Sequence, residues 1–235
     1  MNILCFIVGA IRTDFKDIRT NIMTIKEQIH ANDKCTFIFL TWAPIVKSYK
    51  FYTINYYYDY DKSALENELH DIVNDFIFIE NPDLNTMVKC MNKCPPIATF
   101  YQTYMHEYIN TKNNNNIQYD YVIKTRNDLT IRMNNIYDYF NDATYVPPCF
   151  WSPTRDNHGG ILRLFNDHFY ITTYTKFINF DFSINNINLL ASASWDNEEL
   201  NRRLINPEKL IDVTEYIIQK PGDTIVHVAR LTKAI

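Results

Sequence analysis

The segment from Lys124 to Asp128 combines cations, an amide and a carboxylate directly after an apolar run. That run, YDYVI from Tyr119 to Ile123, is aromatic and β-branched, which is typical of a buried strand. The polar residues KTRND would then lie at the carboxyl end of the strand, where open α/β sheets bind ligands. Arg126 has the forked guanidinium that binds phosphate oxygens, and Asp128 is a ligand type for a hard divalent cation. A buried strand that ends in a charged surface turn explains the same residues without a ligand.

Two earlier apolar runs also end in residues that suit a ligand. The run that begins at Asn2 ends at Gly9 and is followed by Arg12, a candidate partner for a phosphate or a base. A solvated loop arginine is the alternative. The run CTFIFLTW ends in Thr41 and Trp42, and its indole would either stack on a base or pack at the rim of the core.

The second half of the chain holds further candidates for chemistry. The sequence FNDHF at 165–169 places Asp167 in a predicted strand, and a last predicted strand, TIVHVA, carries His227. Ser194 is the predicted N-cap of a helix whose first turn is acidic. The acids of that turn are Asp196, Glu198 and Glu199.

The spacing of apolar residues predicts an α/β fold. Apolar runs alternate with segments of helical spacing in the order βα, βα, βα, β, which is typical of a doubly wound sheet. The predicted strands of this half are 2–9, 34–42, 76–80 and 119–123, and the predicted helices are 14–30, 63–73 and 84–109, the last broken at Pro95 and Pro96. The tyrosine-rich stretch 49–60 suggests an irregular strand or an exposed loop. In the second half we expect short strands at 144–147, 161–172 and 224–229, a short helix or turn at 136–140, and helices at 174–180 and 194–204. No composition shift marks a linker, so we expect one domain.

Composition narrows the classes of function. The chain has 235 residues and a net charge of -4, with a pI of about 5.9, so its overall charge does not indicate nucleic acid as a partner. Its four glycines permit neither GxGxxG nor GxxxxGK[ST], so a nucleotide would have to be held without those loops. The five cysteines form no CxxC pair, which fits a reducing compartment. Cys90 and Cys94, one helical turn apart, leave a zinc site as an alternative.

The N-terminal segment predicts a location inside the cell. Its apolar run is too short for a membrane span, and it lacks the basic lead and cleavage site of a signal peptide. We therefore expect a cytoplasmic protein that would contact a membrane only at its surface.

Together these features resemble the GT-A type of nucleotide-sugar-dependent glycosyltransferase, and within it the WavE-type lipopolysaccharide-synthesis proteins and related glycosyltransferases of giant DNA viruses. The likeness is carried by the opening strand with Gly9 and Arg12, the strand end Thr41-Trp42, YDYVIKTRNDL at 119–129 and FNDHF at 165–169. It implies a single GT-A-like domain over 1–235, with a central, mostly parallel sheet flanked by helices. Residues 1–130 would form the nucleotide-sugar-binding half and 131–235 the acceptor-binding half. A viral protein of this kind would act in the host cytoplasm.

The resemblance implies a donor site and a metal. The donor contacts fall on Gly9, Arg12, Thr41, Trp42, Lys124 and Arg126. The family's DxD metal motif corresponds to Arg126-Asn127-Asp128, where arginine replaces the first acid, so only Asp128 matches as a ligand of Mn²⁺ or Mg²⁺. A late histidine often supplies a second ligand in the family, and His227 holds that place; a half-buried strand histidine is the alternative.

The resemblance also implies a reaction. A sugar would pass from a nucleoside diphosphate to a hydroxyl of a glycan or other acceptor, with the metal and Arg126 or Arg12 stabilising the departing diphosphate. Inverting GT-A enzymes carry the base that deprotonates the acceptor at a helix start beyond the metal motif. Asp196, Glu198 and Glu199 match that place, and Asp167 is the rival. Retaining chemistry is an alternative, as is a degenerate GT-A domain that binds nucleotide-sugar or glycan without turnover. A nucleotidyltransferase fits less well, because GAIRTDFKD is a poor version of its glycine-rich loop.

Overall fold

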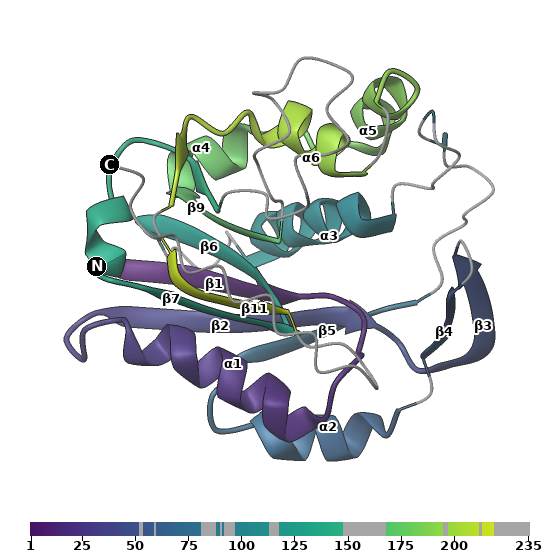
Figure 1. Ribbon diagram of the computed structural model, residues 1–235, viewed down its shortest axis with the longest axis horizontal. Coiled ribbons are helices and arrows are strands. Elements are labelled where there is room, and N and C mark those ends of the chain that lie inside the picture. Colours follow the sequence, from purple (N-terminus) through teal and green to yellow (C-terminus); the bar gives the residue numbers. More distant parts are fainter. Residues whose placement is uncertain are drawn as a thin grey trace.

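A seven-stranded sheet forms the centre of the computed structural model, which describes residues 1–51, 54–58, 60–80, 88–89, 91, 97–112, 118–147, 168–194, 197–211 and 213–218 (Figure 1). The strand order is β10-β8-β9-β6-β1-β2-β5. The strands β5, β2, β1 and β6 are parallel, and β9 is antiparallel to both of its neighbours. The strands are β1 (Asn2–Val8), β2 (Lys34–Trp42), β5 (Asp75–Ile79), β6 (Tyr121–Arg126), β8 (Tyr145–Val146), β9 (Phe169–Thr173) and β10 (Lys209–Leu210).

Helices cover both faces of the sheet (Figure 1). One face packs against α1 (Phe15–Glu27) and α2 (Lys62–Leu69). The other packs against α3 (Ile97–Lys112), α4 (Tyr174–Asn179), α5 (Ile184–Ala191) and α6 (Asn197–Ile205). We call these two faces the α1 face and the α3 face.

The strand β1 shows why its residues form the middle of such a sheet. Leu4 and Phe6 belong to the core of the α3 face, whereas Cys5 and Ile7 belong to the core of the α1 face, and all four are essentially buried. Successive side chains of a strand point to opposite faces, so a strand covered on both faces needs an unbroken apolar run. The sequence of β1 is such a run.

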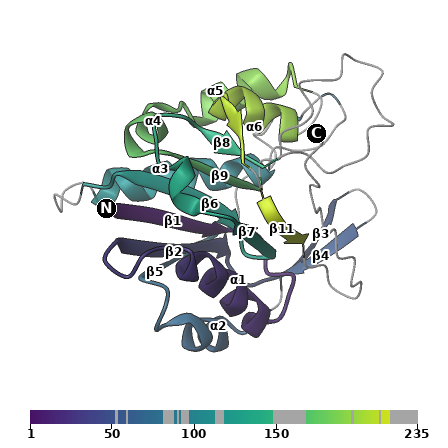
Figure 2. The same cartoon turned by 60° about the vertical axis from the view of Figure 1, so that its left-hand side comes forward.

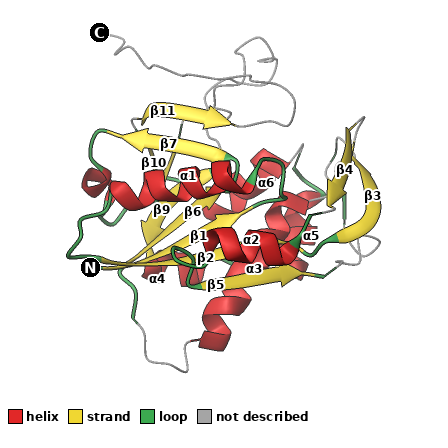
Figure 3. Cartoon of the chain, turned by 90° about the horizontal axis from the view of Figure 1, so that it is seen from below, coloured by secondary structure: helices red, strands yellow, loops and turns green. Residues whose placement is uncertain are grey.

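Two small sheets flank the central one (Figures 2 and 3). The strand β7 (Leu129–Met133) follows β6 after a tight turn and pairs antiparallel with β11 (Val213–Ile218). It packs on α1, where the Gln28 side chain donates to the Ile131 carbonyl at 3.0 Å and accepts from the Met133 amide at 2.8 Å. The hairpin of β3 (Ile45–Phe51) and β4 (Ile54–Tyr58) stands beyond the carboxyl end of β2 (Figure 1).

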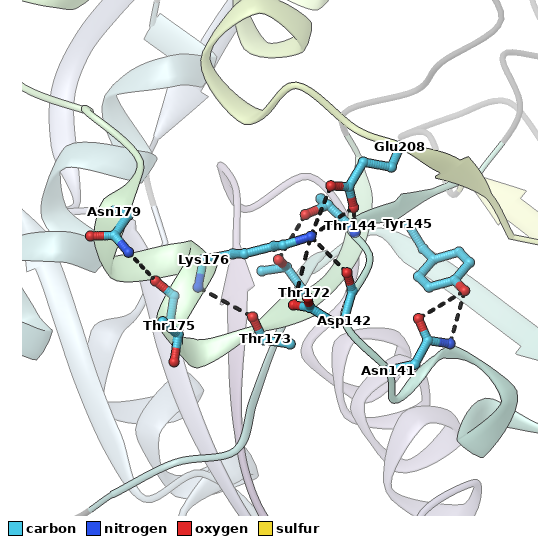
Figure 4. A network of polar contacts seen from close by, with 10 residues as sticks. All are labelled: Asn141, Asp142, Thr144, Tyr145, Thr172, Thr173, Thr175, Lys176, Asn179 and Glu208. Atoms are coloured by element: carbon cyan, nitrogen blue, oxygen red, sulfur yellow. Dashed lines mark hydrogen bonds and ion pairs between the residues drawn. The ribbon is translucent and has the colours of Figure 1, made fainter.

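A polar network fastens the β8–β10 side of the sheet (Figure 4). Lys176 of α4 donates to both carboxylate oxygens of Glu208, at 2.8 and 2.9 Å, and to the Asp142 carbonyl at 2.7 Å. The same Glu208 accepts from the Thr144 amide at 2.7 Å. The network therefore ties α4 to the segments that enter β8 and β10.

The α/β fold predicted from the sequence is confirmed, and the differences lie mainly in the second half. The predicted first strands and helices are present, and α3 begins directly after the Pro95-Pro96 pair. Within the stretch 49–60, residues 49–51 belong to β3 and residues 54–58 form β4, and the predicted short helix or turn at 136–140 is a 3₁₀ helix (Ile136–Tyr139). The antiparallel direction of β9, the strands β7 and β11 and the helix α5 had no prediction. The predicted strand at 224–229 and most of the predicted helix before Pro95 lie outside the described residues. Among the described residues, no helix is both long and apolar enough to cross a bilayer.

Candidate active site

Basic side chains meet at the carboxyl edge of β1 and β6, on the α3 face. In β6, Val122 belongs to the core of the α3 face, so alternation places Lys124 and Arg126 on that face too. Arg126 pairs with Val8 at the end of β1. The neighbouring strand β9 runs the opposite way, so it begins at this edge, with His168 directly before its first residue.

Asn127 joins this edge to the loop that carries Arg12. Its amide group donates to the carbonyls of Gly9 and Ala10 at 2.9 and 3.2 Å, and its backbone amide donates to Val8 at 2.9 Å. Gly9 has a φ of 135°, and a Cβ there would lie 3.1 Å from Asn127 Oδ1. Gly9 therefore permits both the backbone conformation of this loop and the close approach of the Asn127 side chain.

A buried polar contact holds Asn127 from the opposite side. Asn21 of α1, which is 2% exposed, donates to the Asn127 carbonyl at 2.9 Å and accepts from the Thr130 hydroxyl. The turn between β6 and β7 is thus fixed to α1 as well as to β1.

Arg126 and Asp128 form a bidentate ion pair. Arg126 Nε donates to Asp128 Oδ1 at 2.7 Å, and Nη2 donates to Oδ2. The side chain of Asp128 is 2% exposed and that of Arg126 is 19% exposed. Two parallel bonds fix the plane and direction of the guanidinium, so the carboxylate predicted as a metal ligand holds the arginine instead.

Lys124 is a buried cation beside a buried aromatic ring. The lysine is 3% exposed, and its ammonium lies 6.0 Å from the centre of the Tyr170 ring. Tyr170 donates its hydroxyl proton to Gln102 of α3 at 2.8 Å, and both side chains are fully buried. The ring is therefore fixed by a hydrogen bond, and its face attracts the ammonium.

The pKa of His168 depends on its burial and on three neighbouring cations. Burial lowers its pKa well below the ordinary histidine value, and the positive charges of Arg126, Lys124 and Arg12 lower it further. We call Arg12, Lys124, Arg126 and His168 the basic cluster. At neutral pH His168 is therefore uncharged.

His168 had no role in the sequence prediction, although the motif FNDHF that contains it was recognised. The alternation of its strand held the missing signal. Tyr170 faces the core of the α3 face, and a side chain two residues earlier shares that face.

Thr41 and Trp42 lie at the end of β2, but both are buried, at 0% and 4% exposure. Trp42 packs against Tyr101 of α3, with the ring centres 5.4 Å apart, and its carbonyl accepts from the Tyr60 hydroxyl at 2.6 Å. The structure thus corrects the base-stacking alternative for Trp42, because the indole fills the core.

The described side chains do not fit a divalent metal. Within the described ranges, no three His, Cys, Asp or Glu residues are grouped so that they could hold a metal ion. Asp128, the predicted ligand, directs both carboxylate oxygens at Arg126. His227, the predicted second ligand, lies outside the described residues, as do Cys90 and Cys94.

Of the four predicted catalytic acids, the structure describes the side chain of Glu199 alone. Glu199 of α6 accepts from Arg203 one turn later at 2.8 Å, so its carboxylate is engaged within its own helix. Asp167 and Asp196 lie outside the described residues, and the structure does not describe the side chain of Glu198. The role of these acids stays a prediction.

No protein-family model matches the chain, and no curated protein matches its sequence. Solved structures do match it. One is the galactosyltransferase LgtC in complex with donor and acceptor sugar analogues, at 12% identity and a TM-score of 0.49, covering 89% of this chain and 73% of that chain. Another is an active-site mutant of LgtC, at 12% identity and a TM-score of 0.50, covering 90% and 72%.

Identity this low bears on the fold alone. The narrower resemblance to WavE-type and giant-virus proteins stays a prediction. A mostly parallel sheet flanked by helices, matched over 90% of the chain by the LgtC mutant, identifies the fold as GT-A-like.

Proposed function

We propose that this chain is a glycosyltransferase that moves a sugar from a nucleoside-diphosphate sugar to a hydroxyl group of a glycan or another acceptor. The observation that carries the proposal is the position of the basic cluster at the carboxyl edge of a GT-A-like sheet. Guanidinium and ammonium groups bind phosphate oxygens through charge-assisted hydrogen bonds. Ligands of open α/β sheets bind at this edge, so the diphosphate of a donor is the anion that suits it.

The residues present support separate roles in the transfer for the basic cluster and for a carboxylate base. The acceptor oxygen forms a bond to the anomeric carbon while the bond from that carbon to the diphosphate oxygen breaks. The bonding electrons leave with the diphosphate, and the basic cluster stabilises the negative charge that develops there. The proton of the acceptor hydroxyl passes to a base. Asp167, Asp196 and Glu198 are the candidates for that base, and an inverting outcome is proposed together with them.

We assign the donor mainly to residues 1–130 and the acceptor to residues 131–235. His168 qualifies this division, because it comes from the second half of the chain and yet belongs to the basic cluster. The two sites would therefore meet at the start of β9.

Binding without turnover is the second candidate function. It is favoured by the ion pairs of Asp128 with Arg126 and of Glu199 with Arg203, which engage two of the acids predicted for chemistry. A protein of this kind would bind a nucleotide-sugar and release it unchanged.

Thermal-shift binding to UDP, GDP and dTDP, followed by a donor-turnover assay, tests the proposal. A ligand present at about 100 times its dissociation constant stabilises the folded chain by roughly 2.7 kcal/mol. We expect one nucleoside diphosphate to raise the melting temperature, and its sugar conjugates to be consumed when a hydroxyl acceptor is added. Binding without consumption of any donor would favour the second candidate. The absence of a shift with all three nucleotides would contradict both.

A further inference from the structure

We propose that the protein itself supplies the positive charge that holds the donor's diphosphate, and that Asp128 positions Arg126 for this task rather than binding a metal. The inference rests on the proposed function, because it concerns the same donor site. It assigns a separate task to each residue of the Arg126-Asn127-Asp128 segment.

The ion pair of Asp128 opposes a metal at this position. Both carboxylate oxygens accept from Arg126, and the group is 2% exposed. A divalent cation would have to displace a chelating guanidinium from a buried carboxylate. It would also be repelled by the positive charges of Arg12, Lys124 and Arg126, all of which act on His168 at this edge of the sheet. The exchange is unfavourable on both counts.

The net charge of the site suits a diphosphate without a metal. Among the described residues of the site, Arg12, Lys124 and Arg126 contribute three positive charges and Asp128 one negative charge, which leaves two positive charges. A diphosphate that is esterified at both ends carries about two negative charges at neutral pH. The net positive charge of these residues therefore equals the negative charge of the donor's diphosphate.

Each cation is held by a different contact before a ligand arrives. Asp128 fixes the plane of Arg126, and Asn127 fixes the loop of Arg12 through the carbonyls of Gly9 and Ala10. Tyr170 lies beside the ammonium of Lys124. Binding to preorganised groups costs little ordering, and fixed charges stabilise a leaving group better than mobile ones.

The experiment measures the affinity of the full chain for the nucleoside diphosphate selected above, once in EDTA and once in Mn²⁺. Lys124→Met and Arg12→Gln each remove one positive charge from the basic cluster, and Asp128→Asn removes the chelating charge at nearly constant shape. Lys112→Met is the matched control. It removes an equal charge from α3, next to Asp75 at the start of β5, on the opposite edge of the sheet. Melting temperatures of the free variants verify that each one folds.

We expect the wild-type chain to bind in EDTA with an affinity close to that in Mn²⁺. Loss of one charge-assisted contact should weaken binding about 10-fold to 100-fold in Lys124→Met and Arg12→Gln, and leave Lys112→Met unchanged. Asp128→Asn should weaken binding by the same factor in EDTA and in Mn²⁺, because it releases Arg126 in both.

Two outcomes would overturn the inference while leaving the proposed function intact. One is nucleotide binding that disappears in EDTA. The other is an Asp128→Asn variant that loses affinity only in Mn²⁺, which is the behaviour of a metal ligand. A wild-type chain that binds none of the nucleotides under either condition would instead contradict the proposed function itself.

Discussion

Gly9 is the residue where the site depends most directly on backbone geometry. Its φ of 135° disfavours any side chain, and an added Cβ would lie 3.1 Å from Asn127 Oδ1. We expect Gly9→Ala to lower the free energy of unfolding by about 1–3 kcal/mol. Urea denaturation measures this loss, and nucleotide affinity should fall as well because the Arg12 loop moves.

A double-mutant cycle separates the two causes. In an Asn127→Ala background the close contact is absent, so the remaining cost of Gly9→Ala reports the backbone strain alone. Equal costs in the two backgrounds would show that the contact with Asn127 contributes nothing.

His168 predicts a pH dependence of stability. Its pKa in the folded chain lies below the unfolded value of about 6.5, so the unfolded state binds a proton that the folded state does not. The stability that depends on the uncharged form of His168 is therefore complete above about pH 6.5 and is lost as the pH falls below that value. We expect His168→Gln to reduce the loss of stability between about pH 7.5 and 5.5 in urea titrations. His106, whose pKa is also lowered by burial, contributes with the same sign and should keep part of the slope. An unchanged slope in His168→Gln would contradict the assignment.

The site residues show how far residue types alone can lead. Arg126 and Asp128 were recognised from the charges that end a buried strand, and the structure places both at the predicted edge. Their mutual bond could not be read from the sequence, because a carboxylate two residues after an arginine suits a metal and an ion pair equally well. The ion pair depends on the side-chain directions at the turn, which no spacing in the sequence gives.

At the scale of elements, the contacts of Glu208 support the β8–β10 side of the sheet. We expect Glu208→Ala to lower the free energy of unfolding by about 1 kcal/mol, because it removes the partner of Lys176 and the acceptor for the Thr144 amide. The estimate is kept small because the Glu208 side chain is 46% exposed. Glu66→Ala is the control, since its ion pair with Lys62 is 3.9 Å long and exposed, and it should change stability by far less. Urea denaturation of both variants distinguishes the network from an ordinary surface pair.

The elements also divide into those that the sequence predicts and those that it does not. The strands β1 and β2 and the first half of β6 are buried on both faces, so their apolar runs predict them. The direction of β9 and the pairing of β7 with β11 depend on partners distant in the sequence. No local sequence pattern therefore predicts the direction of β9 or the pairing of β7 with β11.

For the whole molecule, the sheet joins the two halves of the chain. The strands β8, β9 and β10 come after residue 130 and extend the same sheet that β5, β2, β1 and β6 begin. We expect a single unfolding transition, with coincident midpoints by tryptophan fluorescence and far-UV circular dichroism in urea. Two separated midpoints would instead indicate that 1–130 and 131–235 are independent domains.

The clamp made by Asn127 has a consequence for the order of folding. Its bonds to Gly9, Ala10 and Asn21 join residues that are 118, 117 and 106 positions apart. Such long-range contacts form only after the intervening chain has been ordered, because closing large loops costs entropy before the contacts compensate it. During synthesis, we therefore expect the Arg12 loop to reach this conformation only after β6 has emerged from the ribosome. A chain that ends before β6 lacks the contacts that hold the Arg12 loop, so we expect it not to bind the nucleotide.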